Sequence, residues 1–344
     1  MKVALCSTIV PFIKGGARQI VEWLEDALVA RGHEVERVYL PEVDHPDCLF
    51  DQMAAFRWID LSSADRVICF RPQSHVVRHP HKVLWFIHHI RSYYDLWDDP
   101  EFGPEHTLQA IGLREALHRV DTAALREARH VYTNSRVVGK RLLRYNGVAS
   151  TVLYPPVHRP ERFRCDDFGD EIVYDSRIEN HKRQHLLVDA LAHTQTPVRL
   201  RLCGVSADDA YVDRIRRLVS ERELTRRVTI ENRGISEDEK LAALAGCLAS
   251  AYLPLDEDSY GYPTLEAAHA GKPTLTTSAS GGVLEFVIDG ENGLCVEATP
   301  EALAGAMDRL YRDRDVTRMM GVRARQRIDA LGVSWDHVLD RLLV

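Results

Sequence analysis

The chain has 344 residues, 45% of them hydrophobic, which exceeds what one core usually serves and predicts two domains of ordinary size. Its 51 Asp and Glu side chains outnumber 44 Lys and Arg, and residues 1–157 hold 19 of each sign. A nucleic-acid-binding domain is expected to be basic, so this balance argues against nucleic acid as a partner.

The cysteines and the apolar runs bear on the cellular compartment. Seven cysteines lie far apart with no CxxC pair, which favours buried free thiols in a reducing cytoplasm over disulfides or a zinc site. No apolar run approaches about 18 residues, and the apolar start is too short for a signal peptide. We therefore expect a soluble, cytoplasmic protein.

In the first half, short β-branched runs alternate with amphipathic stretches, the pattern of βαβ units with parallel strands. Strands are expected at 2–6, 34–40, 66–70, 82–86, 130–133 and 151–154, and helices include 18–30 and 137–145. Residues 154–170 contain three prolines and no periodicity, which predicts a linker.

A basic helix face raises the question of membrane contact. Arg136, Lys140, Arg141 and Arg144 lie in or beside the expected helix 137–145. A solvated face is the simpler interpretation, and peripheral contact with acidic lipids is the alternative.

The alternation restarts after the linker. Strands are expected at 171–177, 198–203, 227–231, 249–253 and 273–277, with helices near 184–192 and 208–223 and a third beginning at Ser236. Ser236 and Glu239 have capping-box spacing. This pattern predicts two Rossmann-like, doubly wound α/β domains, 1–157 and 158–330, with a helix in 331–344 packing back toward the first. Such domains bind ligands beyond the carboxyl ends of their strands.

Two loops after strands carry groups suited to phosphate. Gly15 and Gly16 precede a helix, where free amides and the helix dipole favour an anion, although an ordinary tight turn explains them equally well. Arg177 and Lys182 are five positions apart and suit a diphosphate; two solvated surface cations are the alternative.

The segment 256–275, DEDSYGYPTLEAAHAGKPTL, places two carboxylates around a helix start. Pro263 suits the first turn, and Gly261 lets a ligand approach the backbone amides that follow. Asp258 precedes the helix and Glu266 lies within it, eight residues on. The pattern suits a ligand with hydroxyls at both ends and negative charge between them; a loop acid and a helix-dipole partner are the plain alternative.

Taken in order, these motifs resemble glycosyltransferase family 4, and the resemblance covers nearly the whole chain. The matching segments are Gly15-Gly16, Thr133-Asn134-Ser135, Arg177 with Lys182, Asp258 to Pro273, Ser280-Gly281-Gly282 with Glu285, residues 289–296 and the final stretch 334–343. Two positions depart from the family pattern. Asp258 stands where glutamate is usual, and Arg183 stands where glycine is common.

The resemblance implies a GT-B fold, two Rossmann-like domains facing a central cleft, with the acceptor domain first. It implies that Glu266 holds the ribose and that Asp258 and the backbone around Gly261 hold the donor sugar, within a donor-binding segment of Tyr260, Gly261, Tyr262, Pro263 and Thr264. It further implies that Arg177 and Lys182, helped by Gly16, neutralise the leaving diphosphate. Transfer is then retaining and needs no metal or other cofactor.

Residues 82–103 follow a strand with a cluster of ring side chains. The resemblance places a histidine here, near donor sugar and acceptor, and His88 fits better in register than His89. Candidates for acceptor binding are His89, Arg91, Tyr94 and Trp97, since aromatic rings pack on sugar faces. Covering the core is the equally weighted alternative.

The sequence therefore predicts a retaining glycosyltransferase that uses a UDP- or GDP-sugar and a glycan, a lipid-linked saccharide or a small molecule as acceptor. The alternatives are a nucleotide-sugar epimerase or a sugar phosphorylase on the same fold, and a non-catalytic nucleotide-sugar-binding partner subunit. A phosphorylase would normally be much longer and would need a lysine-bound cofactor.

Overall fold

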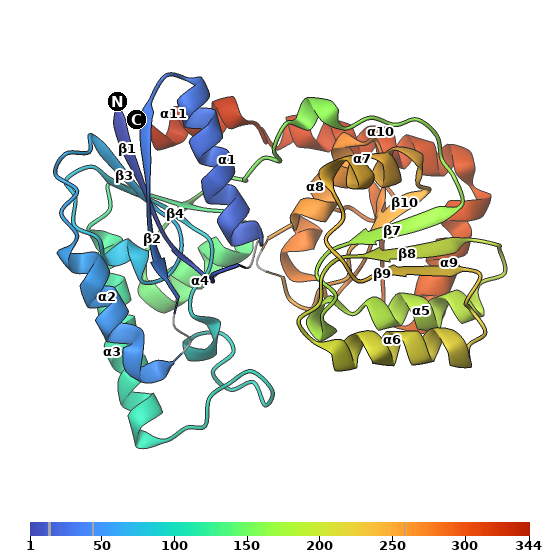
Figure 1. Cartoon of the computed structure of the whole chain (residues 1–344), viewed down its shortest axis with the longest axis horizontal. Helices are drawn as coiled ribbons and strands as arrows, with labels where there is room; N and C mark the ends of the chain where they lie inside the picture. Colours follow the sequence, from blue (N-terminus) through green and yellow to red (C-terminus); the bar gives the residue numbers. More distant parts are fainter. Residues whose placement is uncertain (13–14, 43–44, 258) are drawn as a thin grey trace. The chain divides into compact units, whose positions relative to one another are not determined.

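A computed structural model describes residues 1–12, 15–42, 45–257 and 259–344. The chain forms two compact units (Figure 1). The first contains Met1–Pro156 and Val333–Val344, and the second contains Val157–Gly332. These borders lie within two residues of those expected from the sequence.

The first unit is built on a sheet of six parallel strands. In spatial order these are β2 (Glu34–Pro41), β1 (Lys2–Ile9), β3 (Arg66–Cys69), β4 (Lys82–Phe86), β5 (His130–Thr133) and β6 (Thr151–Val152). The chain steps from β1 outward to β2, then returns past β1 to β3. The gap between β1 and β3 is therefore the topological switch point of this sheet.

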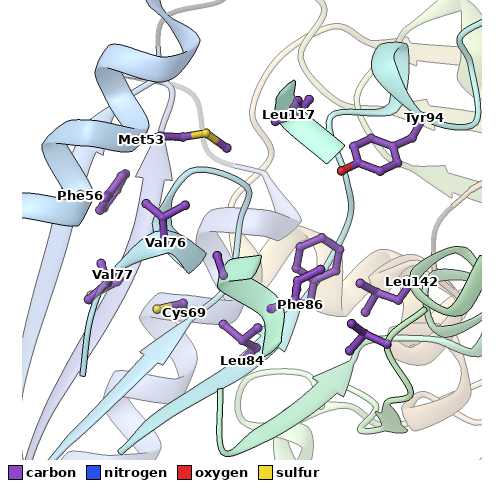
Figure 2. Close-up of a cluster of buried hydrophobic side chains, with 14 of the residues drawn as sticks. Met53, Phe56, Cys69, Val76, Val77, Leu84, Phe86, Tyr94, Leu117 and Leu142 are labelled. Atoms are coloured by element: carbon purple, nitrogen blue, oxygen red, sulfur yellow. The ribbon is translucent and has the colours of Figure 1, made fainter. Parts of the chain in front are cut away.

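Two hydrophobic cores cover the two faces of this sheet. Helices α1 (Gly16–Ala30) and α11 (Trp335–Leu342) contribute to one core. Helices α2 (Leu49–Trp58), α3 (Leu108–Arg126) and α4 (Arg136–Asn146) contribute to the other, part of which is drawn in Figure 2. Period-two alternation of apolar residues along β1 to β4 feeds both cores.

The second unit repeats the architecture. Its strands lie in the order β9 (Val228–Glu231), β8 (Arg199–Cys203), β7 (Glu171–Asp175), β10 (Ala249–Ala251), β11 (Thr274–Thr277) and β12 (Gly293–Val296), all parallel. Its helices are α5 (Gln184–His193), α6 (Asp209–Glu221), α7 (Glu237–Gly246), α8 (Tyr262–His269), α9 (Pro300–Arg312) and α10 (Arg314–Ala330). The switch point lies between β7 and β10.

Short polar side chains start many of these helices. Ser236 and Glu239 form the predicted capping box on α7. Thr107, Ser135, Asp208, Thr299 and Ser334 each accept a hydrogen bond from a first-turn amide. Single 3-10 turns lie at Pro46–Cys48, Ser74–Val76, Arg91–Tyr93, Pro160–Arg162, Asn180–Lys182 and Gly281–Glu285.

The C-terminal helix α11 belongs to the first unit and lies beside α1, as Figure 1 shows in red against blue. Its side chains Val338, Leu339 and Leu342 are buried in the core shared with α1. Arg31, the C-cap of α1, pairs with Asp336 at 2.7 Å and with Asp340 at 2.8 Å. These exposed pairs contribute little, so apolar burial carries the docking.

The remaining sequence expectations concern charge, thiols and membrane spans. Arg141 turns inward and pairs with Asp95 at 3.1 Å, while Arg136, Lys140 and Arg144 remain exposed on α4. All seven cysteines are free thiols. Among the described residues, no helix combines the length and apolar character needed to span a bilayer.

We predict that Leu339→Ala lowers the free energy of unfolding of the first unit by about 2–5 kcal/mol, because it removes a side chain that is 2% exposed and leaves a cavity. Urea titration followed by circular dichroism measures this. The matched control is Leu108→Ala, at a leucine that is 90% exposed in the same unit. Equal, small effects of both substitutions would contradict the docking of α11.

Candidate functional site

The candidate site lies at the switch point of the second unit. There the carboxyl ends of β7 and β10 are neighbours, and the chain leaves them in opposite directions. The loop 176–183 follows β7 and the loop 252–261 follows β10. In doubly wound sheets this is where ligands bind.

The side chain of Tyr174 links these two loops by hydrogen bonds. Its hydroxyl, at the end of the fully buried β7 side chain, donates to the carbonyl oxygen of Lys182 at 2.5 Å and accepts from the amide of Leu253 at 2.9 Å. The amide of Leu255 also donates to the carbonyl oxygen of His181 at 2.8 Å. The loops are therefore held in one arrangement by the sheet beneath them.

Arg183 adds a second fastening. Its guanidinium donates to the carbonyl oxygens of Leu253 (2.7 Å) and Pro254 (2.8 Å) and to the hydroxyl of Thr277 (2.7 Å). Its backbone has φ +57°, a left-handed conformation that costs a non-glycine residue on the order of 1 kcal/mol and that glycine adopts freely. This gives a physical reason for glycine at the matching family position. Here the cost of the left-handed backbone is offset by four hydrogen bonds of the guanidinium, the fourth to the hydroxyl of Ser280 at 3.4 Å.

Lys182 forms a largely buried ion pair in this site. Its ammonium group, with 10% of the side chain exposed, bonds Glu257 Oε2 and donates to Tyr252 Oη at 2.9 Å. Tyr252 Oη in turn donates to Glu257 Oε2 at 2.8 Å. Burial alone would raise the pKa of Glu257, but the charge of Lys182 and these hydrogen bonds outweigh it and lower the pKa to about 2. Glu257 is therefore a permanent anion.

The turn after β11 holds Glu257 in position. The amide of Gly282 donates to the carbonyl oxygen of Glu257 at 2.7 Å, and the amide of Asp256 donates to Ala279 at 2.9 Å. A Cβ atom on Gly281 would lie 2.6 Å from the Glu257 backbone, and one on Gly282 would lie 2.8 Å from Ser259. The Gly-Gly pair of the sequence motif is thus required by close backbone contact.

Helix α8 begins beside this pair. Gly261 precedes the helix with φ +71°, and a Cβ atom there would lie 2.2 Å from the Tyr252 ring. Pro263 occupies the second helical position, and the hydroxyl of Thr264 is buried without a hydrogen-bond partner among the described residues. First-turn amides lack intrahelical partners, so the helix start offers donors to an anion.

The tyrosines of the predicted donor segment, Tyr260 and Tyr262, differ in exposure. Tyr260 is 1% exposed, with its ring centroid 6.1 Å from that of Phe286, so its side chain serves packing. Tyr262 is half-buried. Asp258, the predicted first carboxylate, lies outside the described residues.

Glu266 lies one turn into α8, at 5% exposure, within a cluster of two acids and one lysine. Its Oε1 accepts from Lys240 Nζ of α7 at 2.5 Å. Burial, and then the charge of Glu266, raise the pKa of Asp175 at the end of β7 to about 7. Glu266 therefore pairs with Lys240 and lies beside the carboxyl group of Asp175, whose pKa is raised.

Arg177 is the most accessible predicted cation of this loop. Half of its side chain is exposed, and its Nη1 donates to Glu179 Oε1 at 2.7 Å. An exposed pair of this kind contributes little and can open at small cost.

His88, in the first unit, follows β4. A carbonyl oxygen only accepts, so Nδ1 must donate its proton to the carbonyl oxygen of His89, 2.7 Å away. Burial, reinforced by the charge of Arg71, lowers the pKa of His88 to about 4. At neutral pH the ring is therefore uncharged and Nε2 is a hydrogen-bond acceptor.

The predicted acceptor residues near His88 are mostly part of the core. His89 and Tyr94 are both 2% exposed, and their rings lie 4.1 Å apart. Trp97 is 7% exposed and stacks on His106 at 4.4 Å. Figure 2 draws Tyr94 within the same buried cluster as Phe86 and Leu117. The structure favours the core alternative for these three rings, whereas Arg91, paired with Asp95 at 2.7 Å, stays partly exposed.

Gly15 and Gly16 also belong to the first unit, at the start of α1. Gly15 is the N-cap, with extended backbone and no side-chain cap, and a Cβ atom there would meet nothing within 4 Å. Close contact inside the described structure therefore does not demand glycine at position 15. The remaining reason to expect an anion here is the start of α1, whose free amides can donate hydrogen bonds.

Four residues of the site escaped sequence reasoning: Asp175, Lys240, Tyr252 and Glu257. Asp175 and Tyr252 carried a weak signal, since each is a polar or amphipathic residue at the carboxyl end of a strand beside the switch point. Glu257 was passed over for its neighbour Asp258. Lys240 lies on a helix distant in sequence and carried no local signal.

A separate pocket of about 460 Å³ lies between α7 and strands β7 to β9. Arg201 crosses it, pairing with Glu171 at 2.6 Å and Glu231 at 2.8 Å. Arg233 pairs with Glu231 at 2.8 Å and Glu239 at 2.6 Å. Two arginines here face three glutamates, so no excess positive charge is left for an anionic donor, and we place the functional site at the switch point instead.

We predict that Asp175→Asn stabilises the second unit more at pH 8 than at pH 5. The folded-state pKa of about 7 lies above the unfolded value of about 3.9, so the native state binds the extra proton and loses stability as pH rises through that window. Asparagine does not titrate, so the Asp175→Asn variant does not lose stability in this way. Urea titrations at both pH values measure the difference, with exposed Asp213→Asn as control. An equal effect of Asp175→Asn at both pH values would contradict the cluster.

Comparison with known proteins finds relatives in sequence and in fold. Residues 166–327 match the family model described as glycosyl transferases group 1. An α-1,3/1,6-mannosyltransferase of Mus musculus is 30% identical over 37% of this chain and 30% of its own length. A GDP-mannose-dependent α-(1-6)-phosphatidylinositol monomannoside mannosyltransferase of Mycobacterium tuberculosis is 28% identical over 61% of this chain and 58% of its own. The match spans less than two-thirds of each of these relatives.

Solved structures resemble the chain over its whole length. The Anabaena protein HepE, crystallised with UDP and glucose, superposes with a TM-score of 0.70 at 19% identity, covering 100% of this chain and 98% of that one. Sucrose-phosphate synthase of Thermosynechococcus elongatus superposes with a TM-score of 0.78 at 20% identity, covering 99% and 97%. The chain therefore has the GT-B fold, and its residues 166–327 match the family model of the glycosyl transferases group 1.

Proposed function

We propose that this protein is a retaining glycosyltransferase that moves a sugar from a UDP- or GDP-sugar to a hydroxyl group of a glycan, a lipid-linked saccharide or a small molecule. The observation that carries the proposal is the constellation at the second switch point. There a buried lysine, the start of α8 and a buried glutamate lie at the carboxyl ends of β7 and β10.

Each group has a role in donor binding. The positive charges of Lys182 and Arg177 and the first-turn amides of α8 bind the diphosphate. The hydroxyl of Thr264 is a further hydrogen-bond donor. The carboxylate of Glu266 accepts hydrogen bonds from the ribose hydroxyls, while Lys240 donates to the same carboxylate. A side chain at position 261 would clash with the Tyr252 ring, so glycine there lets α8 begin beside Tyr252.

The chemistry that follows is electrostatic. As the bond between sugar and diphosphate breaks, negative charge grows on the leaving oxygen, and preorganised cations and amides stabilise it without reorganising. The fastenings by Tyr174 and Arg183 supply this preorganisation. In this proposal the cations do the work that a metal ion does in other nucleotide-sugar enzymes.

The neighbours support a nucleotide-sugar donor of this class. Their names include GDP-mannose-dependent mannosyltransferases, and HepE was crystallised with UDP and with UDP-glucose. These names do not decide between a uridine and a guanosine nucleotide, so the binding experiment uses both UDP and GDP.

We predict that UDP or GDP raises the melting temperature of the protein selectively, because a ligand that binds only the folded state stabilises it by mass action. Lys182→Ala and Glu266→Gln should each weaken binding of that nucleotide at least tenfold in calorimetry, since each removes a charged group that contacts the ligand. Lys140→Ala, at an exposed lysine of α4, is the control. Unchanged affinity in both site variants would remove this assignment.

Product analysis separates the alternatives. Transfer requires an acceptor and preserves anomeric configuration, which NMR of the product reveals. An epimerase would convert the donor without any acceptor. A non-catalytic binding subunit would hold the donor yet show neither transfer nor slow donor hydrolysis.

We further predict that Glu257→Gln tightens nucleoside diphosphate binding about three- to tenfold at neutral pH. Glu257 is anionic and shares the ammonium group of Lys182, so it competes with and repels a diphosphate at that position. Calorimetry measures the gain, and exposed Glu291→Gln is the control. Weaker binding would show instead that Glu257 serves to position Lys182.

A further inference from the structure

One edge of the first unit is built from a segment that carries positive charge only. Residues 128–160 contain no aspartate or glutamate and hold six lysine and arginine side chains, although the whole chain has a net charge of -7. Strand β5, helix α4 and strand β6 all lie in this segment, and α4 packs against both strands. Because β6 is the edge strand of the sheet, these elements form one side of the unit.

Helix α4 gathers its exposed residues on one face. These residues, which we call the basic face, are Arg136, Lys140, Leu143 and Arg144. They follow one another at i, i+4, i+7 and i+8, so they lie on one side of a helix with 3.6 residues per turn. The buried residues of the same helix, on its other side, are Val138, Leu142 and Asn146.

An apolar side chain lies among the cations of the basic face. Leu143 is 59% exposed, whereas the neighbouring Leu142 is fully buried. Lysine and arginine have long apolar stems, so Lys140 and Arg144 can border an apolar contact while their charged ends reach a polar layer. An exposed apolar residue flanked by lysine and arginine is typical of helices that lie at the surface of a bilayer.

The charge of the basic face is directed toward solvent. Arg141, which lies outside this face, is the α4 cation that contacts Asp95, at 3.1 Å, and Arg91 shares the same carboxylate at 2.7 Å. The guanidinium of Arg144 lies over the Tyr145 ring, with 5.2 Å from Cζ to the ring centroid. A ring contact of this kind leaves the positive charge in place.

Charge and composition narrow the partner. The net negative charge of the chain argues against nucleic acid. A specific protein interface usually has a core of aromatic or apolar residues that excludes water, and the basic face has Leu143 alone in that role. An anionic bilayer needs no such core, because its headgroups attract every cation near the surface, and each cation strengthens binding about fivefold.

We propose that the basic face of α4 docks the protein on a bilayer that contains anionic lipids. Lys140 and Arg144 meet the lipid phosphates, Leu143 enters the headgroup region, and Arg136 adds charge at the start of the helix. The docking is reversible and weakens with salt, because it rests on few charges and one apolar side chain. It does not depend on the proposed transferase function.

The test is sedimentation of the full-length protein with vesicles of phosphatidylcholine that contain phosphatidylglycerol, beside vesicles of phosphatidylcholine alone. Binding to the anionic vesicles should be at least tenfold tighter at low salt and should be lost near about 0.5 M salt. The double variant Lys140→Gln/Arg144→Gln should weaken it about 25-fold, fivefold for each charge. Leu143→Ser should weaken it roughly three- to tenfold, which a purely electrostatic contact would not show.

The matched control is the double variant Arg216→Gln/Arg217→Gln, which removes two exposed positive charges from α6 in the second unit and should leave vesicle affinity unchanged. Nucleotide affinity measured in parallel should be unchanged in every variant, so failure of the donor site and failure of the docking are distinguished. If the α4 double variant does not fold, Lys140→Gln alone should still weaken vesicle binding about fivefold.

Four results would overturn the proposal. The first is no preference of the natural protein for the anionic vesicles, including no binding to either kind. The second is unchanged affinity in the α4 variants, and the third is an equal loss in the control double variant, which would show an effect of net charge alone. The fourth is equally tight binding of soluble polyglutamate, which would identify an acidic protein as the partner.

Discussion

The buried pair between Lys182 and Glu257 is the interaction on which the candidate site depends. Removing one partner of such a pair typically costs about 3–5 kcal/mol, because the other charge stays buried without compensation. The loops after β7 and β10 are consequently tied to each other by charge as well as by the hydroxyl of Tyr174. In the proposed function, a diphosphate that binds here replaces Glu257 as the anion beside the ammonium group of Lys182. The site can therefore take up a highly charged ligand without first burying an unpaired lysine.

Local sequence signals predicted much of the fold because they act locally. Strands β4 and β5 match the expected ranges, since each is an apolar run bounded by polar residues, and the capping box starts α7 where expected. Strand β6 ends two residues early, just before Tyr154 and the prolines that cannot donate to a ladder. Helices α2 and α3 were not anticipated. Their apolar faces are defined by the sheet they cover, as Met53, Phe56 and Leu117 show, rather than by a clear sequence period.

The candidate site was predictable only where spacing along the chain carries the chemistry. Arg177, Lys182 and Glu266 occupy loops or helix starts after strands, and the fold brings those positions to one edge of the sheet. Lys240 and Tyr252 join them by tertiary contact, which no spacing encodes. The ring cluster after β4 illustrates the opposite difficulty. A run of aromatic residues reads the same whether it faces a ligand or the core, and only burial separated Tyr94 and Trp97 from a binding role.

The two sheets carry the same kind of ion pair at their switch points, in different surroundings. Each places a cation and a carboxylate at its switch point, Lys182 with Glu257 in the second unit and Arg71 with Glu42 in the first. In the second unit the neutral pair is supplemented by the charge of Arg177 and the dipole of α8, so the balance favours an anion. In the first unit the supplements are Thr8 and a neutral His88, which add hydrogen-bonding capacity without charge. The same strand-end geometry therefore presents additional positive charge in the second unit and uncharged hydrogen-bonding groups in the first, according to what surrounds the pair.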